Sequence, residues 1–314
     1  MKTAFLFPGQ GSQYVGMAAD LTSIDAARRI LEAADVILGF PLTERMFGTG
    51  NADADEERLR QTDVTQPALL VHSMAVYAVL VERGVHPDAA AGHSLGEYSA
   101  LTAAGALSFE DALKTVRLRG ELMAEAGTRR PGAMAAVLGA DDQVVEAICT
   151  AASTTTEVVQ PANYNAPGQI VISGDGPAVD RAMAIAPDHG VKRVVQLPVS
   201  GAFHSTLMEF ARAGLGEALD RLSVKTPSCP VYLNVSAEPT TDPNQIRKAL
   251  LDQLTAPVRW SQSLANMQRD GVIRYVEVGA GNVLAGLAKR TLGRDVETQT
   301  IGSADDLERI GTGS

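Results

Sequence analysis

Short apolar runs alternate along the chain with longer segments whose apolar positions recur at helical spacing. The short runs at residues 3–7, 231–235 and 275–278 predict buried strands. The longer segments predict helices, and Pro67 suits the first turn of one of them. Ser108 is a predicted N-cap of another, because an acidic residue follows three positions later. The combination predicts an α/β fold, with helices within residues 15–48, 56–61, 68–81 and 109–126.

The pattern changes after a linker at residues 127–132. Six short elements follow in the order strand, helix, strand, strand, helix, strand, which is the split βαβ arrangement of a ferredoxin-like subdomain. They span residues 133–138, 141–151, 158–162, 169–173, 177–186 and 191–197, with residues 163–168 as the hairpin turn between the middle strands. We therefore predict a large α/β domain of residues 1–129 and 200–314 that carries an inserted subdomain of residues 130–199.

A candidate nucleophile lies in the stretch around Ser94. Gly92 and Gly96 flank it at the spacing G-x-S-x-G, between a predicted strand and a predicted helix. This is the pattern of a nucleophile elbow, in which a strained turn exposes the serine hydroxyl and the glycines allow strand and helix to approach. The same spacing also arises by chance in loops rich in glycine and serine, so the pattern alone leaves the role of Ser94 open.

A glycine-rich loop follows the first predicted strand. Its Gly9 and Gly11 suggest a phosphate cradle, but the third glycine of a dinucleotide site and the Lys-Ser/Thr pair of a P-loop are both missing. A better interpretation is a loop that supplies a backbone N–H to an oxyanion. An acyl-transfer serine needs one such donor from the residue after it, here Leu95, and a second from a neighbouring strand end.

Two further side chains could join Ser94. His204 follows a strand end near a predicted helix N-terminus, where the helix dipole would keep the imidazole neutral, as a general base requires; a packing or capping role is the alternative. Arg119 projects into the apolar face of the helix after Ser108, whereas Arg117 falls outside that face. A buried arginine needs a partner, which is either an internal acid or the carboxylate of a substrate.

Composition narrows the function classes. The 314 residues are 45% hydrophobic and 20% charged, as in an ordinary globular protein. The net charge of −10 argues against nucleic acid as a partner. Cys149 and Cys229 have no metal-ligand or redox spacing, so no metal site is expected. The N-terminal apolar run is too short for a signal peptide, and no stretch approaches the length of a membrane span, so we expect a cytoplasmic protein without membrane contact.

Seven short motifs follow one another along the chain. They are Phe7-Pro8-Gly9-Gln10-Gly11-Ser12-Gln13, Thr65-Gln66-Pro67-Ala68, Gly92-His93-Ser94-Leu95-Gly96-Glu97-Tyr98, Arg119-Gly120, Asn163-Tyr164-Asn165-Ala166-Pro167-Gly168-Gln169, Gly201-Ala202-Phe203-His204-Ser205 and Val278-Gly279-Ala280-Gly281. In these motifs and their order the chain resembles the malonyl-CoA:acyl carrier protein transacylase family, over roughly residues 3–295.

The resemblance implies an α/β-hydrolase-like large domain with a ferredoxin-like insert, and a role for each of nine residues. Ser94 is the implied nucleophile and His204 its base, oriented by the backbone carbonyl of Gln253. The implied oxyanion donors are the backbone N–H groups of Gln10 and Leu95. The implied substrate-binding residues are Arg119, which would hold the malonyl carboxylate, together with Phe203, Gln66 and Asn163.

The resemblance also implies the reaction and its partners. Malonyl-CoA would be the substrate, acyl carrier protein the acceptor, and no cofactor or metal would be bound; we expect a monomer. Three alternatives stay open: a free-standing polyketide acyltransferase, the transferase subunit of malonate decarboxylase, and a thioester hydrolase. A non-catalytic carrier-protein docking module would have little use for Ser94, His204 and Arg119 together.

Overall fold

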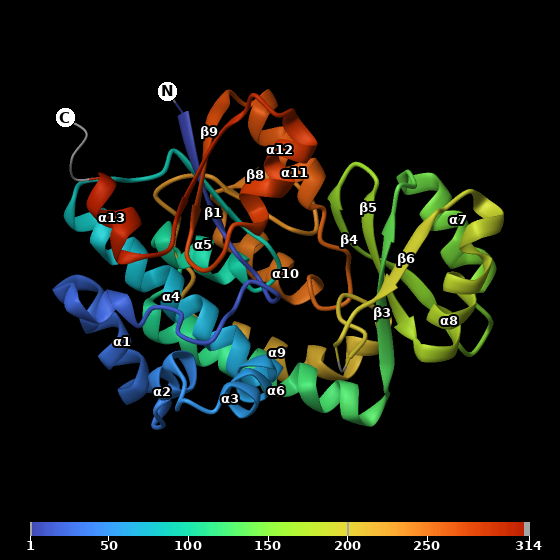
Figure 1. Ribbon diagram of the computed structural model, residues 1–314, viewed down its shortest axis with the longest axis horizontal. Helices are drawn as coiled ribbons and strands as arrows, with labels where there is room; N and C mark the ends of the chain where they lie inside the picture. Colours follow the sequence, from blue (N-terminus) through green and yellow to red (C-terminus); the bar gives the residue numbers. More distant parts are fainter. Residues whose placement is uncertain (1, 200, 311–314) are drawn as a thin grey trace.

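The computed structural model describes residues 2–199 and 201–310, and its strands form two separate sheets with helices packed around them (Figure 1). This mixed α/β architecture agrees with the sequence prediction. Residue 200, the predicted start of the second part of the large domain, and residues 311–314 lie outside the described residues.

The larger sheet has the strand order β10-β9-β1-β2-β7-β8. Neighbouring strands are parallel except for the short antiparallel pair β7 and β8 at one edge. The strand predicted at residues 231–235 is shorter than expected, because β7 ends after two residues. The strands are β1 (Lys2–Phe7), β2 (Ala89–Gly92), β7 (Val231–Tyr232), β8 (Pro239–Thr240), β9 (Val272–Val278) and β10 (Glu297–Ile301).

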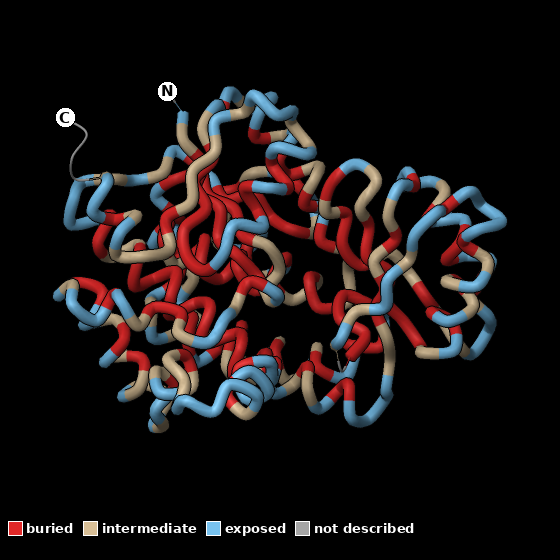
Figure 2. The backbone as a smooth tube through the Cα atoms, viewed as in Figure 1, coloured by how far each residue is buried: buried red, intermediate tan, exposed pale blue. Residues whose placement is uncertain are grey.

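Helices cover both faces of this sheet, and the alternation of side chains along β1 shows how. Phe5 and Phe7 pack into one apolar cluster, whereas Ala4 and Leu6 pack into another, as expected for a strand with a two-residue period. Figure 2 shows the buried backbone concentrated along the sheet and the inner helices. The helices around the larger sheet are α1 (Asp25–Leu38), α2 (Leu42–Phe47), α3 (Ala52–Arg60), α4 (Thr62–Glu82), α5 (Gly96–Ala103), α6 (Phe109–Arg129), α9 (Glu209–Arg221), α10 (Pro243–Asp252), α11 (Trp260–Arg269), α12 (Val283–Leu292) and α13 (Ala304–Ile310).

Helix α4 corrects two expectations. It begins at Thr62, so Pro67 lies inside the helix rather than in its first turn. Proline cannot donate to the carbonyl four residues earlier, and that Asp63 carbonyl accepts instead from Arg117 Nη1 at 2.6 Å. The helix is also long and apolar enough to cross a membrane by length and composition, contrary to the sequence prediction. However, 83% of its most apolar window is buried inside the protein, as the central helix of a packed core requires.

The smaller sheet has the order β4-β5-β3-β6, with antiparallel neighbours throughout. Its elements occur in the predicted order and lie together at the right of Figure 1. One prediction was wrong: residues 163–166 belong to a strand rather than to the hairpin turn, since Asn163 pairs with Val171 and Tyr164 with Ile170. The elements are β3 (Gly132–Leu138), α7 (Asp142–Ala152), β4 (Val159–Ala166), β5 (Gln169–Asp175), α8 (Gly176–Ile185) and β6 (Arg193–Gln196).

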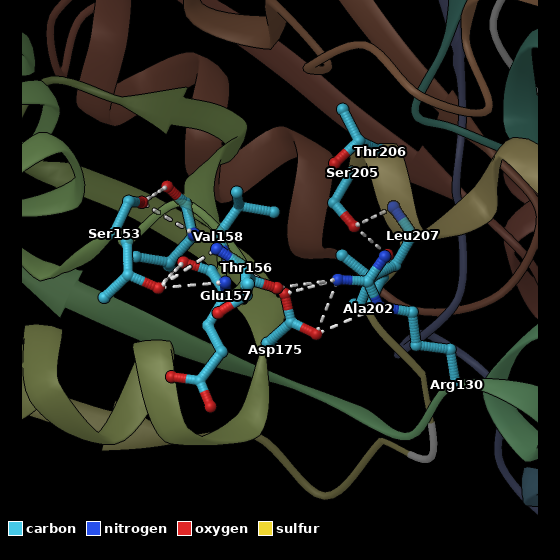
Figure 3. A network of polar contacts seen from close by, with 12 residues as sticks. Arg130, Ser153, Thr156, Glu157, Val158, Asp175, Ala202, Ser205, Thr206 and Leu207 are labelled. Atoms are coloured by element: carbon cyan, nitrogen blue, oxygen red, sulfur yellow. Dashed lines mark hydrogen bonds and ion pairs between the residues drawn. The ribbon is translucent and has the colours of Figure 1, made fainter.

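A polar network joins the end of α6 to the smaller sheet (Figure 3). Asp175, at the end of β5, accepts two hydrogen bonds from Arg130 at 3.0 Å and one from the Val158 N–H at 2.8 Å. Close by, the start of β3 lies directly against the segment that leads into His204, because a Cβ on Gly132 would lie 2.5 Å from Cβ of Ala202.

Candidate active site

The serine predicted as nucleophile lies at the tip of a strained turn. Strand β2 ends at Gly92, α5 begins at Gly96, and Ser94 between them has a positive φ of 51°. A Cβ on Gly92 would lie 1.8 Å from the Gly96 carbonyl oxygen, and one on Gly96 would lie 2.0 Å from the Phe7 carbonyl oxygen. Only glycine fits at either position, as the G-x-S-x-G spacing predicts.

Asn234 secures this turn from a second turn, just after β7, that is distant in sequence. Its Oδ1 accepts from the Ser94 N–H at 2.7 Å, and its Nδ2 donates to the Gly92 carbonyl at 2.7 Å. The side chain is 1% exposed. Sequence analysis did not single out this residue, and the available signal was a polar residue within the apolar run predicted as a strand at residues 231–235.

His204 lies against Ser94 in the orientation of a general base. The Ser94 hydroxyl donates to Nε2 at 2.7 Å, and Nδ1 donates to the Gln253 carbonyl at 2.8 Å. That backbone acceptor fixes the tautomer with its lone pair toward the serine. Burial, and after it the positive charge of Arg119, lowers the pKa of His204 to about 3. The imidazole is therefore neutral at neutral pH, although burial rather than a helix dipole is the main cause.

Arg119 reaches the same point from α6. Its side chain is 1% exposed, and Nη1 donates to Gln66 Oε1 at 2.6 Å. Its Nη2 donates to Gln253 Oε1 at 2.9 Å and to Ser94 Oγ at 3.1 Å. Within the described residues Nε has no hydrogen-bond partner and no carboxylate forms an ion pair with this guanidinium. A structural ion pair, one of the two alternatives from the sequence, is therefore not formed.

By contrast, Arg117 lies outside this cluster, as the helical spacing predicts. It is partly exposed, and it forms ion pairs with Asp63 at 3.0 Å and Glu121 at 2.7 Å. The same helix thus presents one paired surface arginine and one buried arginine directed at the serine.

The cluster opens into a cavity of about 190 Å³ between the two sheets. Met134 of β3 and Val171 of β5 supply its apolar wall from the smaller sheet. Every residue singled out from the sequence lines this cavity except Gln253, which lies behind it. The lining includes Gln10, Gln66, Ser94, Leu95, Arg119, Asn163, Phe203 and His204.

His93 is a further lining residue that sequence reasoning did not single out. Its Nε2 lies 2.8 Å from Asn165 Oδ1, and its ring meets the Trp260 ring edge-to-face with centroids 5.6 Å apart. Burial lowers its pKa, so the ring is neutral beside the cavity.

A buried acid lies beneath the cluster. Glu97 is 0% exposed, and burial raises its pKa to about 7. Its Oε2 accepts from the Asn234 N–H at 2.9 Å and from Gln253 Nε2 at 2.9 Å. Sequence analysis did not single out this residue, and the available signal was an acid in a helix otherwise built mainly from small and apolar residues.

Comparison with known proteins places this geometry in a family. The family model described as acyl transferase domain matches residues 4–308. The chain is 44% identical over 308 residues to malonyl CoA-acyl carrier protein transacylase of Bacillus subtilis, covering 98% of this chain and 95% of that one. The same comparison with the Staphylococcus aureus (strain MW2) protein of that name gives 43% identity, covering 98% and 97%.

Solved structures of proteins with related names are similar to this chain as well. A crystal structure of an acyl carrier protein S-malonyltransferase from Vibrio cholerae superposes with a TM-score of 0.92 at 40% identity, covering 99% of this chain and 100% of that one. A complex of a type II PKS acyl-carrier protein with its malonyl-transacylase gives 0.91 at 37% identity, covering 98% of each chain. The chain belongs to the malonyl CoA-acyl carrier protein transacylase family of acyl transferases.

Proposed function

We propose that this protein transfers the malonyl group of malonyl-CoA to the phosphopantetheine thiol of acyl carrier protein through a malonyl ester of Ser94. One observation carries the proposal: Ser94 Oγ lies 2.7 Å from a neutral imidazole and 3.1 Å from a buried guanidinium that has no acid partner among the described residues. A nucleophile, a base and a carboxylate anchor converge on one cavity.

In the first half-reaction His204 removes the Ser94 proton while Oγ attacks the thioester carbonyl. The backbone N–H groups of Gln10 and Leu95 would hold the resulting oxyanion. The tetrahedral intermediate collapses, the carbon–sulfur bond breaks, and the imidazolium returns the proton to the coenzyme A thiolate. The Gln253 carbonyl holds the ring throughout and stabilises its charged form.

In the second half-reaction the carrier-protein thiol gives its proton to His204 and attacks the malonyl ester. Collapse of this intermediate breaks the ester bond, returns the proton to Ser94 and leaves malonyl on the carrier. The enzyme is thus regenerated in a ping-pong cycle.

Substrate choice would rest on Arg119. A planar guanidinium and a planar carboxylate form a two-point contact that an acetyl group cannot make. Gln66 would orient the guanidinium through its 2.6 Å contact, and Asn163, which is 6% exposed at the cavity, would contact the acyl group. The bulk of Phe203 beside His204 would disfavour a branched acyl chain such as methylmalonyl.

The finer description of the fold is part of the proposal. We assign residues 1–129 and 200–314 to an α/β-hydrolase-like domain and residues 130–199 to a ferredoxin-like insert. The parallel core of the larger sheet and the β-α-β-β-α-β order of the smaller one support this assignment. We further propose that the protein is a cytoplasmic monomer that requires no cofactor and binds neither nucleic acid nor membrane.

A thioester hydrolase is the competing class. The test loads the enzyme with radiolabelled malonyl-CoA, removes free substrate, and follows the label in buffer and after addition of holo acyl carrier protein. Transfer to the carrier that is much faster than release into water supports the proposal. Equal release with and without carrier would indicate a hydrolase.

The choice of carrier protein separates three pathways. The malonyl CoA-acyl carrier protein transacylase of Bacillus subtilis is 44% identical to this chain, and the transacylase in a solved complex with a type II PKS acyl-carrier protein is 37% identical. Rates measured with a fatty-acid carrier, a polyketide carrier and the malonate decarboxylase carrier would assign the pathway.

A further inference from the structure

Glu97 is the one buried acid that contacts the active-site residues among the described residues, and the reaction proposed above gives it no task. It lies on α5, three residues after Ser94 and fully shielded from solvent. A carboxylate in such a place is costly unless hydrogen bonds compensate it. Burial raises its pKa, and the bonds from Asn234 and Gln253, together with the charge of Arg119, oppose that rise.

The Gln253 side chain connects this acid to the arginine. Its Oε1 accepts from Arg119 at 2.9 Å, and its Nε2 donates to Glu97 Oε2 at 2.9 Å. The Ser94 carbonyl and Asn234 Oδ1 also face Nε2, at 3.0 and 3.3 Å. Of these three acceptors only Glu97 can carry a charge, and a hydrogen bond to its ionised form is about twice as strong as one to a neutral acceptor.

The orientation of this amide matters for Arg119. If the amide turned over, its N–H₂ group would face the N–H groups of the guanidinium, and the guanidinium would lose an acceptor in a buried site. The backbone carbonyl of Gln253, which holds His204, would not be affected by that rotation. A disturbed amide would therefore impair the arginine more than the histidine.

We infer that Glu97 is a positioning residue for substrate choice: its Oε2 fixes the Gln253 amide so that Oε1 faces Arg119 and holds the guanidinium toward the acyl group. The inference rests on the proposed function. It adds that selection of a carboxylated acyl group depends on an acid that never contacts the substrate.

The test measures kcat/KM for malonyl-CoA and for acetyl-CoA and takes their ratio. In Glu97→Ala we expect the malonyl-to-acetyl ratio to fall about tenfold, the effect of one lost charge-assisted hydrogen bond. A structural role in the elbow alone would slow both substrates equally and leave the ratio unchanged, which would overturn the inference. If the wild-type enzyme forms no malonyl-serine at all, the proposed function fails instead.

A double-mutant cycle tests the route of the effect. Gln253→Ala keeps the backbone carbonyl and should lower the ratio by itself. Adding Glu97→Ala to it should lower the ratio no further, because the amide through which the acid acts is already gone. Additive losses would contradict the inference.

Two other variants guard against misfolding. Glu97→Gln keeps an oxygen able to accept both bonds and should hold the ratio within about threefold of wild type. Glu97→Asp withdraws the carboxylate by one methylene and should lower the ratio. A glutamine variant as impaired as the aspartate variant would overturn the assignment of Oε2 as the essential acceptor.

Glu277 offers a matched control. It is also 0% exposed, and its Oε2 accepts from the Ala285 N–H at 2.8 Å, away from the cluster. Glu277→Ala should reduce stability and leave the malonyl-to-acetyl ratio unchanged. An equal fall in the ratio would show that loss of any buried acid produces the effect, and would refute the specific role of Glu97.

Discussion

Ser94 and His204, 110 residues apart in the chain, both have backbone dihedrals in the left-handed region, with φ of 51° and 58°, and their side chains meet at 2.7 Å. Such a conformation costs about 1–3 kcal/mol for a residue with a side chain. Asn234 supports the first turn, and the second is supported by Gln160 Nε2, which donates to the His204 carbonyl, and by Ser205 Oγ, which donates to the Ala202 carbonyl. The dyad is thus held by the fold rather than by its own local preference.

The glycines of the first turn should be irreplaceable. In Gly92→Ala the new Cβ would overlap the backbone of Gly96, which cannot move without displacing Ser94. We expect a loss of more than about 3 kcal/mol in the free energy of unfolding, measured by urea denaturation. Gly286→Ala is the control, because its Cβ would meet no atom within 4 Å on α12. That variant should gain about 0.5–1 kcal/mol, and equal losses in both would contradict the steric account.

Replacement of Arg119 should reverse substrate preference. In Arg119→Ala the malonyl carboxylate loses its anchor and kcat/KM for malonyl-CoA should fall by at least about a hundredfold, while that for acetyl-CoA should rise. Arg119→Lys should remain impaired, since an ammonium group cannot form the two-point contact. If malonyl transfer survives in the alanine variant and acetyl transfer does not rise, Arg119 is not the anchor of the malonyl carboxylate.

The depressed pKa of His204 predicts an unusual pH profile. With a pKa of about 3 in the fold, the imidazole stays neutral well below the ordinary value of 6.5. The reaction of Ser94 with an uncharged serine-directed sulfonyl fluoride should therefore keep its rate from pH 7 down to pH 5. Arg119→Ala removes a positive charge and should shift the acidic limb upward. A limb at pH 6.5 in both proteins would contradict this explanation.

Buried Glu277 predicts the pH dependence of stability. Burial raises its pKa from 4.5 to about 7, so the unfolded chain loses this proton first as the pH rises between those values. Folding stability should fall over that range, by up to about 3 kcal/mol from this residue. Glu277→Gln should flatten the decline measured by denaturation at pH 4.5 and 8. If the dependence of stability on pH is the same in Glu277→Gln as in the wild type, another group causes the decline. Glu97 is the other candidate, because burial raises its pKa to about 7 as well.

Local patterns in the sequence predicted much of this structure. The predicted Ser108 cap is formed, since its Oγ accepts from the Asp111 N–H at 3.0 Å. The helical spacing also correctly predicted that Arg119 lies on the buried face of its helix. Both depend only on neighbours within a few residues. The order of elements in the smaller sheet was predictable for the same reason.

Other features depend on contacts that no local pattern encodes. Asn234 supports the serine turn from 140 residues away, and β4 extends through Asn163 because β5 and Val258 offer partners on both sides. Pro67 was misplaced because a distant arginine satisfies the carbonyl that proline leaves free. In each case tertiary structure overrides a local preference.

The central claim is that the hydroxyl of Ser94 carries the malonyl group between donor and acceptor. Intact-mass spectrometry after mixing with malonyl-CoA tests it directly, with wild type and Ser94→Ala side by side. We predict a single malonyl adduct on the wild-type chain that disappears on addition of carrier protein, and none on the alanine variant. An adduct of equal yield on both proteins would contradict the account.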